Sequence, residues 1–161
     1  MNILLVSDDH GFAGFETAFN NAVREYGQIH AVLHAGDTQK DNEDYYNDIC
    51  DGVLFVSVRG NNDFNDAPME RKLKLGGKSI LLTHGHRYNV YFGIQSICSA
   101  AMEKQCDIVV YGHTHQRNHQ KGEDLEVINP GSLTGIRSSL RSYAVLVIDD
   151  DGSTKVNFHE Y

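Results

Sequence analysis

Five short apolar runs, each followed at once by polar residues, constrain this chain more than any other feature of its sequence. They lie in the segments NILLVSDDH (2–10), HAVLHAGD (30–37), GVLFVSVRGNND (52–63), SILLTHGH (79–86) and DIVVYGHTH (107–115). Continuous apolar runs of this length are typical of strands that are buried on both faces. Because such strands need helices or a second sheet to cover them, the pattern predicts an α/β fold.

Two stripes of apolar residues at helical spacing lie between these runs. The first predicts a helix that ends near Gly27, and it consists of Phe15, Phe19, Ala22, Val23 and Tyr26. The second predicts a helix over residues 90–101, and it consists of Val90, Ile94, Ile97, Cys98 and Ala101. The pair Gly76-Gly77 predicts the tight turn of a hairpin over residues 71–86.

The last third of the chain has a different character. Its segments LEVINPGS, SYAVLVIDDDG and STKVNFHEY have the pattern of strands, with few helix signals between them. We therefore expect a second, largely antiparallel sheet there. The 161 residues are enough for one compact core, and no linker divides them. We expect a single domain over residues 1–161, in which two sheets pack face to face with helices outside.

Composition argues against several classes of protein. Cys50, Cys98 and Cys106 fall outside any CxxC spacing, which indicates neither a disulfide framework nor a structural zinc site and favours a reducing cytoplasm. The longest apolar run, YAVLVI at 143–148, is far shorter than the roughly 20 residues of a membrane helix. The N-terminal residues MNILLVSDDHG lack the basic lead of a signal peptide, so we expect a soluble protein.

The net charge bears on the choice of partner. A formal charge of −8 opposes binding to nucleic acid, whose affinity for proteins comes mainly from clustered lysine and arginine. Bound divalent cations would reverse the local sign of the charge and admit a small anionic substrate. A homo-oligomer is compatible with the sequence, but no feature of the sequence marks an interface.

The polar residues that follow the five runs are suited to holding metal ions. In open α/β sheets the carboxyl ends of the strands meet at the crevice where ligands bind. Carboxylate, amide and imidazole groups suit Mn²⁺, Zn²⁺, Fe²⁺ or Ni²⁺. Seven such residues are more than one ion needs, so we expect two ions that share a bridging carboxylate. The seven are Asp8, His10, Asp37, Asn61, His84, His113 and His115.

Each segment alone also has a structural explanation. Gly36-Asp37 and Gly60-Asn61 are common turn pairs, and His84 and His86 could be histidines at the edge of a core. The shared position of all five segments at strand ends is what favours a metal centre. Four other histidines lie outside the clusters of polar residues at the strand ends and receive structural or surface assignments: His30, His34, His119 and His159.

Taken in order, the motifs DxH, GD, GN, H and GHxH resemble the signature of the calcineurin-like metallophosphoesterase superfamily. They are present as SDDH, AGD, RGNND, THGH and YGHTH, and the resemblance extends from residue 7 to INPGS at 128–132. The length, the GNxD form and the NPGS segment are similar to the small single-domain, YfcE-type branch of bacterial and archaeal phosphodiesterases. This resemblance implies a four-layer α/β/β/α sandwich of two mixed sheets with flanking helices.

The resemblance also implies an activity, which is hydrolysis of a phosphate ester, most typically a diester, by a hydroxide that bridges two divalent metals. Mn²⁺ is the expected cofactor, with Ni²⁺, Zn²⁺ and Fe²⁺ as alternatives, and a small phosphodiester or nucleotide-like molecule is the expected substrate. The ligands implied are Asp8, His10 and His115 for one ion, Asn61, His84 and His113 for the other, and Asp37 as the bridge.

Three other residues near these motifs leave alternatives open. The wider superfamily often has histidine directly after the GN pair, where this chain has Asn62. An amide donates a hydrogen bond but delivers no proton near pH 7, so aryl diesters are expected to be better substrates than alkyl monoesters. We expect His86 to take part in catalysis, either as a general acid or as a phosphate contact. Asp63 either is structural or orients a neighbouring group.

Arg137 and Arg141 either contact phosphate or belong to a solvated face. A different class of function is the alternative to the enzyme. The retromer subunit Vps29 resembles the same branch and serves as a protein-interaction scaffold. Its metal-site pattern is incomplete, whereas every ligand position is filled in this chain, which favours the enzyme.

Overall fold

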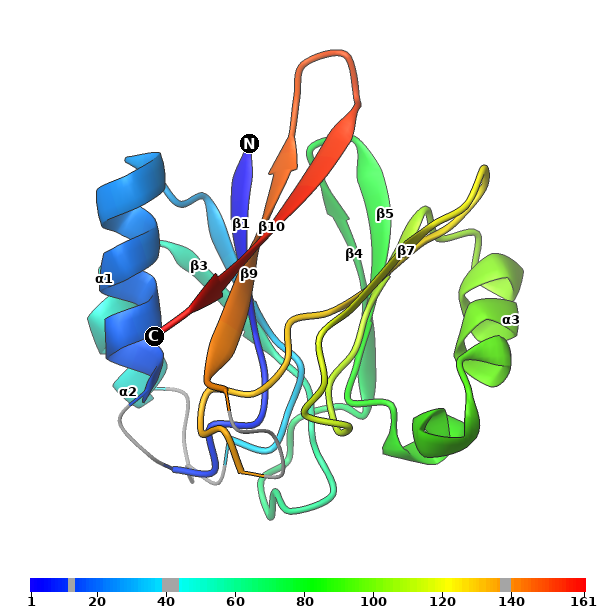
Figure 1. The fold of residues 1–161 in the computed structure, drawn as a ribbon, viewed down its shortest axis with the longest axis horizontal. Helices are drawn as coiled ribbons and strands as arrows, with labels where there is room; N and C mark the ends of the chain where they lie inside the picture. The colour runs from blue at the N-terminus through cyan, green and yellow to red at the C-terminus, as the bar shows by residue number, and fades with distance from the viewer. Residues whose placement is uncertain (12–13, 39–43, 137–139) are drawn as a thin grey trace.

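The computed structural model describes residues 1–11, 14–38, 44–136 and 140–161. In these ranges the strands form two five-stranded sheets with the orders β10-β9-β1-β2-β3 and β4-β5-β6-β8-β7 (Figure 1). The first sheet consists of β1 (Asn2–Val6), β2 (Ala31–His34), β3 (Leu54–Ser57), β9 (Ser142–Ile148) and β10 (Thr154–Glu160). The second consists of β4 (Glu70–Leu75), β5 (Lys78–Thr83), β6 (Ile108–Val110), β7 (Asn118–Lys121) and β8 (Glu126–Asn129).

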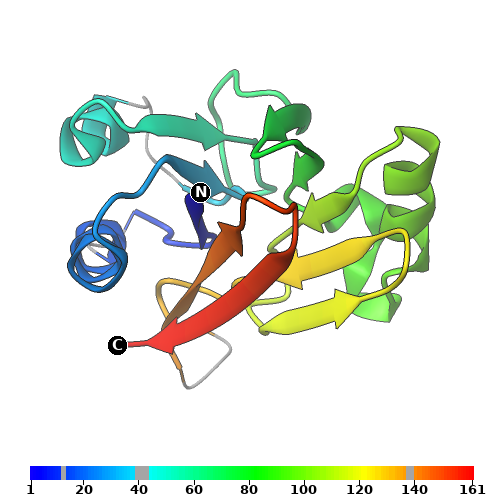
Figure 2. The same cartoon turned by 90° about the horizontal axis from the view of Figure 1, so that it is seen from above.

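Helices cover the outer faces of both sheets. Helices α1 (Gly14–Tyr26) and α2 (Asp44–Cys50) lie on the first sheet, and α3 (Gln95–Glu103) lies on the second (Figures 1 and 2). The predicted four-layer α/β/β/α sandwich of two mixed sheets is therefore confirmed. Within the described ranges, none of the helices combines the length and the apolar character that crossing a bilayer requires.

Alternate residues of the central strands pack into different cores. In β1, Ile3 and Leu5 belong to the core between the two sheets. Leu4 and Val6 point the other way and pack with Phe15 of α1. The apolar runs are continuous because both faces of these strands are covered, one by the opposite sheet and one by helices.

The structure corrects the prediction for the last third of the chain. The strands there do not form a separate antiparallel sheet. Strand β9 pairs with β1 in the first sheet, whereas β8 pairs in parallel with β6 in the second. The apolar pattern of a segment predicts that it is a strand, but it does not predict which strand lies beside it. Strand β9 is as deeply buried as β1 and pairs with it.

Two further differences concern helices and short strands. The helix predicted over residues 90–101 is interrupted at Gly93, whose φ of 135° breaks it into a 3-10 turn, η2 (Val90–Phe92), and α3. The sequence analysis did not predict α2 or β7. Their segments, DYYNDIC and NHQK, are short and carry few aliphatic residues, so periodicity marks them weakly. The hairpin at Gly76-Gly77 is confirmed.

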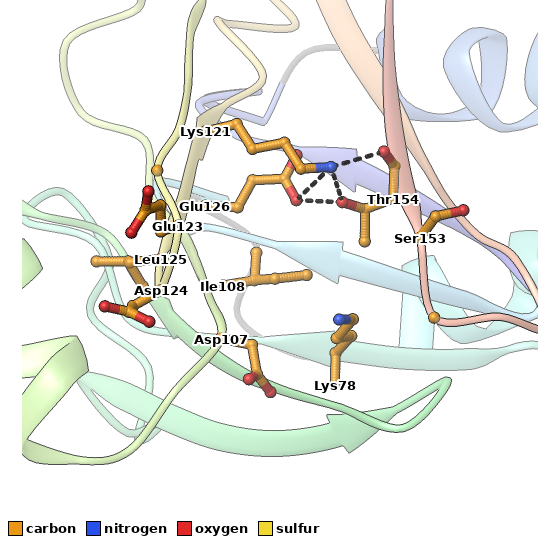
Figure 3. A pocket seen from close by; sticks show the side chains of 12 residues that line it. Lys78, Asp107, Ile108, Lys121, Glu123, Asp124, Leu125, Glu126, Ser153 and Thr154 are labelled. Atoms are coloured by element: carbon orange, nitrogen blue, oxygen red, sulfur yellow. Dashed lines mark hydrogen bonds and ion pairs between the residues drawn. The ribbon is translucent and has the colours of Figure 1, made fainter.

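At the amino ends of β5, β6 and β8 the two sheets are joined by polar side chains around a hollow of about 230 Å³ (Figure 3). Lys121 Nζ donates hydrogen bonds to Thr154 O at 3.0 Å and to Thr154 Oγ1 at 2.7 Å. The hydroxyl of Thr154 donates to Glu126. Lys121, Thr154 and Glu126 thus bind one another, and we assign these side chains a structural role.

The core between the sheets gives a test of the fold. Leu33 is fully buried there, so Leu33→Ala is expected to lower the free energy of unfolding by about 2–5 kcal/mol. Leu54 is the matched control because it lies on the edge strand β3 and is 50% exposed. Leu54→Ala is expected to change the free energy of unfolding by less than about 0.5 kcal/mol. Urea unfolding followed by circular dichroism measures both, and equal losses would contradict this description of the core.

Candidate metal centre

The expected metal ligands all follow the carboxyl ends of strands. Strands β1, β2 and β3 are parallel, and so are β5 and β6, so the loops after them lie at one end of the sandwich, which is the lower end in Figure 1. The structure brings together all seven residues that the sequence analysis named. Their polar atoms form two adjoining clusters.

The first cluster surrounds the Nε2 atom of His84. Asn61 Oδ1 lies 3.1 Å from it and His113 Nδ1 lies 3.2 Å from it. Asp37 Oδ2 lies 3.5 Å from the same nitrogen. Ligand atoms that bind one ion at about 2.0–2.2 Å stand roughly 3–4 Å apart. This spacing fits a divalent ion.

The second cluster surrounds the Nε2 atom of His115. Asp8 Oδ1 lies 3.1 Å from it and His10 Nε2 lies 3.4 Å from it. Asp37 Oδ2 reaches this cluster as well, because it lies 3.9 Å from His10 Nε2. A single carboxylate oxygen therefore stands next to both clusters, which is the place of a bridging ligand.

The nitrogen and oxygen atoms of the two clusters are better suited to binding cations than to hydrogen-bonding with one another. Two of the short contacts, His10 to His115 and His84 to His113, bring two imidazole nitrogens together. Within the described part of the chain, the buried Asp8 Oδ1 accepts no hydrogen bond of proper geometry. Buried polar atoms normally have a partner, so this oxygen points to a missing ligand. The residues fit divalent metal ions.

Electrostatics keeps the ligands in forms that can bind metal. Burial acts to raise the pKa of the Asp37 carboxyl, but hydrogen bonds from His84 and Asn62 outweigh it and hold this pKa well below its usual range. Burial and the nearby His84 lower the pKa of His113 to about 4, so its ring is neutral at pH 7. Asp37 and Asp8 raise the pKa of His84 against the effect of burial. A bound metal ion would compete with a proton for the ring of His84.

The backbone at the centre is strained. Left-handed φ angles are rare for residues other than glycine and cost of order 1–2 kcal/mol each. Most of the non-glycine residues with positive φ in the described ranges are expected ligands. These ligands are Asp8 (56°), His10 (49°), Asp37 (58°), His113 (69°) and His115 (58°). Such strain persists where packing enforces it, and it is typical of functional sites.

Asp63 ties the ligand-bearing loops together. Its Oδ2 accepts hydrogen bonds from the backbone N–H of Asp37 at 2.9 Å and of Gly60 at 2.7 Å. Its Oδ1 accepts a hydrogen bond from the hydroxyl of Thr38 at 3.0 Å. Asp63 is buried and holds the loop after β2 against the loop after β3. The structural alternative for this residue is therefore the one that the geometry supports.

The sequence analysis missed a buried polar group behind the centre. Asp9 stands between two ligands in the chain, and its Oδ2 accepts a hydrogen bond from Tyr46 at 2.7 Å and lies 3.7 Å from His34 Nε2. His34 Nδ1 in turn accepts the N–H of Gly36 at 3.2 Å. The only sequence signal was a second acidic residue within SDDH. The group supports the backbone of the loops that carry Asp8 and Asp37.

The remaining candidates take different positions. Asn62 donates its backbone N–H to Asp37 Oδ1 at 2.8 Å and its side-chain amide to Asp37 Oδ2 at 2.7 Å. The ring of His86 lies 5.4 Å from that of His84. Arg141 is exposed, and Arg137 lies outside the described residues.

A hollow of about 190 Å³ opens over the two clusters. The residues that line it are His10, Asp37, Asn61, Asn62, His113, His115 and Ile136.

The fold and the ligand set are those of a metal-dependent hydrolase. The calcineurin-like phosphoesterase superfamily domain matches residues 1–151, and the chain belongs to this family of metallophosphoesterases. It is 30% identical over 163 residues to a probable metallophosphoesterase of Bacillus subtilis, YsnB, with 99% of this chain and 91% of that protein covered. A crystal structure from Streptococcus pneumoniae, described as a predicted phosphoesterase, is 31% identical with a TM-score of 0.81 and covers 99% of this chain and 88% of its own.

Two more distant structures share the fold. An archaeal phosphodiesterase is 22% identical with a TM-score of 0.78, and the match covers 99% of this chain and 100% of that chain. Wild-type Vps29 from Entamoeba histolytica, solved in complex with Zn²⁺, is 24% identical with a TM-score of 0.73, and the match covers 99% of each chain.

The strained backbone gives a test that needs no metal. In metal-free protein, His10→Gly is expected to be more stable than His10→Ala by roughly 0.5–1 kcal/mol, because glycine adopts a positive φ without steric cost. The exposed Glu16 in α1 is the control position, where glycine is expected to be less stable than alanine by up to about 1 kcal/mol. Thermal and urea unfolding of the four variants measure both differences. The same order at both positions would contradict the strain at His10.

Proposed function

We propose that this chain is a phosphodiesterase that depends on two divalent metal ions. The observation that carries the proposal is the position of Asp37 Oδ2, 3.5 Å from His84 Nε2 in one cluster and 3.9 Å from His10 Nε2 in the other. One carboxylate oxygen that stands next to both clusters can bind two ions at once. In two-metal hydrolases the distance between the two ions is about 3.5–4 Å. When bound, two such ions supply a hydroxide at neutral pH and neutralise the charge of a phosphate diester.

Asn62 and His86 have separate roles beside the expected metal ligands. Asn62 fixes both oxygens of Asp37, so the shared carboxylate is already oriented before substrate binds. Burial and the neighbouring His84 lower the pKa of His86, which leaves its ring neutral at pH 7. Its ring lies 5.4 Å from that of His84 and 6.0 Å from that of His113. We assign His86 to a hydrogen bond with a phosphate oxygen through Nε2, because its Nδ1 is buried.

The substrate, the metal and the compartment follow from the same arrangement. Because the amide of Asn62 is engaged with Asp37 and delivers no proton, leaving groups that need little protonation are favoured, and small aryl or nucleotide-like diesters are the proposed substrates. The mixed set of carboxylate, amide and imidazole ligands supports Mn²⁺ as the first choice, before Ni²⁺, Zn²⁺ and Fe²⁺. The free thiols of Cys50, Cys98 and Cys106 support a reducing cytoplasm.

A protein-interaction scaffold is the second candidate. It rests on the likeness in fold to Vps29, at 24% identity. The complete set of seven ligands supports the enzyme in preference, because a scaffold needs no bridging carboxylate. Hydrolysis that depends on Asp37 separates the two.

Asp37→Asn is the central test of the proposal. Metal-stripped wild-type protein is expected to recover hydrolysis of bis(p-nitrophenyl) phosphate when Mn²⁺ is added, and the variant is expected to lose at least about 100-fold in kcat/KM together with bound metal. Release of p-nitrophenolate and elemental analysis measure the two quantities. Asp48→Asn, at an exposed position of α2, is the control. Full activity of Asp37→Asn would exclude the bridging role, and inactivity of the wild type with every metal would favour the scaffold.

Asn62 gives a test of leaving-group dependence. Asn62→His is expected to raise the ratio of kcat/KM for an alkyl diester to that for an aryl diester by about tenfold or more, because a histidine protonates a poor leaving group. Asn62→Ala is the control, since it removes the same side-chain hydrogen bond to Asp37 without adding an acid. Steady-state kinetics with the two diesters measures the ratio. If histidine and alanine shift the ratio equally, this position does not govern protonation of the leaving group.

A further inference from the structure

Four exposed apolar side chains lie on loops next to the candidate metal centre. Phe64 is 95% exposed and Phe92 is 93% exposed, and Tyr91 and Ile136 are each about half exposed. We refer to these four residues as the apolar rim. Side chains this large and this accessible normally have a binding partner when they gather at a functional site. The loops that carry them lie at the end of the sandwich where the ligands meet (Figure 1).

Two rim residues contact the ligands directly. Ile136 lines the hollow over the centre, and its carbonyl accepts a hydrogen bond from His115 Nδ1. Tyr91 donates its hydroxyl hydrogen to His113 O at 2.9 Å, and the two rings stand 4.7 Å apart between centroids. A molecule at the metal ions therefore meets these side chains as soon as it extends beyond the hollow.

The other two rim residues continue the same surface along the chain. Phe92 follows Tyr91 within the 3-10 turn η2. Phe64 directly follows Asp63, which holds the loops that carry Asp37 and Asn61. Among the described residues, neither phenylalanine forms a hydrogen bond or a ring contact with an expected ligand, so each can be replaced with less effect on the centre than Tyr91.

The hollow is too small for a whole substrate of ordinary size. It has a volume of about 190 Å³, whereas sites for drug-sized ligands occupy roughly 300–1,000 Å³. The phosphate group therefore occupies the hollow, and its ester groups extend past the rim. In-line displacement expels the leaving group opposite the attacking oxygen, so the ester group that stays on phosphorus passes the edge of the hollow, which Ile136 lines and where Tyr91 stands beside His113.

We propose that the apolar rim binds a planar ring on the ester group that the phosphate retains, and that the substrates are small diesters of nucleosides. This inference rests on the proposed phosphodiesterase function and names its substrate class. Three of the four rim residues are aromatic, and aromatic side chains stack on nucleobases of any sequence. The charge of −8 opposes a long polynucleotide, so a mononucleoside diester fits best.

The reaction in this proposal is a hydrolysis that balances without a further reactant. The oxygen of water forms a bond to phosphorus, and the bond from phosphorus to the leaving oxygen breaks. The leaving group departs as an alcohol or a phenolate, and the proton of water goes to that oxygen or to solvent. The nucleoside monophosphate is the other product.

Three substrates with one leaving group test the proposal. The Mn²⁺-loaded enzyme is assayed with the p-nitrophenyl diesters of thymidine 5′-phosphate, methyl phosphate and phosphocholine. The thymidine ester is expected to exceed the methyl ester in kcat/KM by at least about tenfold. Phe92→Ala and Phe64→Ala are expected to lower this ratio severalfold, mainly by raising KM for the thymidine ester. Phe92→Leu keeps an apolar side chain without a ring, and it is expected to lower the ratio nearly as far.

Met102→Ala is the matched control, because Met102 is also an exposed apolar residue but lies on α3. It is expected to leave the ratio unchanged. Hydrolysis of the thymidine and methyl esters at similar kcat/KM would overturn the proposal while the phosphodiesterase function stands. Preference for the phosphocholine ester would overturn it in favour of a quaternary ammonium group held by the aromatic rings. Absence of turnover for all three esters would contradict the phosphodiesterase function itself.

Discussion

The carboxylate of Asp37 lies where the two sheets meet, and the rest of the structure depends on how it is held. One of its oxygens stands near His10, which follows a strand of the first sheet, and near His84, which follows a strand of the second. Asn62 donates hydrogen bonds to both oxygens, and Asp63 binds the backbone N–H of Asp37. Because residues from both sheets converge on this carboxylate, the centre exists only when the sandwich is assembled.

This dependence explains why the ligands tolerate a strained backbone. Left-handed conformations at Asp8, His10, Asp37, His113 and His115 oppose folding locally. The buried strands that precede them supply the compensating stability through the cores on either side of each sheet. Strand packing thus fixes the loops in conformations that the loops alone would not adopt, and it brings the donor atoms of the seven expected ligands together.

The sequence was sufficient to predict which residues meet at the candidate metal centre, but not the groups that support them. Each ligand directly follows an apolar run, so its place at a strand end was predictable from hydropathy and from the rule for parallel strands. The sequence shows that Asn62 stands where the wider superfamily has histidine, but it does not show that the amide of Asn62 donates a hydrogen bond to Asp37. Asp9 and Tyr46 meet only through a contact across 37 positions of the chain, which no local pattern encodes. The membership of β9 in the first sheet is a long-range pairing of the same kind.

The two ends of the sandwich carry similar side chains and differ in how these are satisfied. At the amino ends of β5, β6 and β8, Glu126 stands beside His119, Lys121 and the hydroxyl of Thr154, so each acceptor has a donor. At the carboxyl ends, imidazole nitrogens stand 3.4 Å and 3.2 Å from one another, and among the described residues the buried Asp8 Oδ1 has no hydrogen-bond donor of proper geometry. A divalent cation would bind the imidazole nitrogens and the carboxylate oxygen together. The same residue types therefore stabilise the fold at one end and favour metal ions at the other, and the difference lies in whether donors are matched to acceptors.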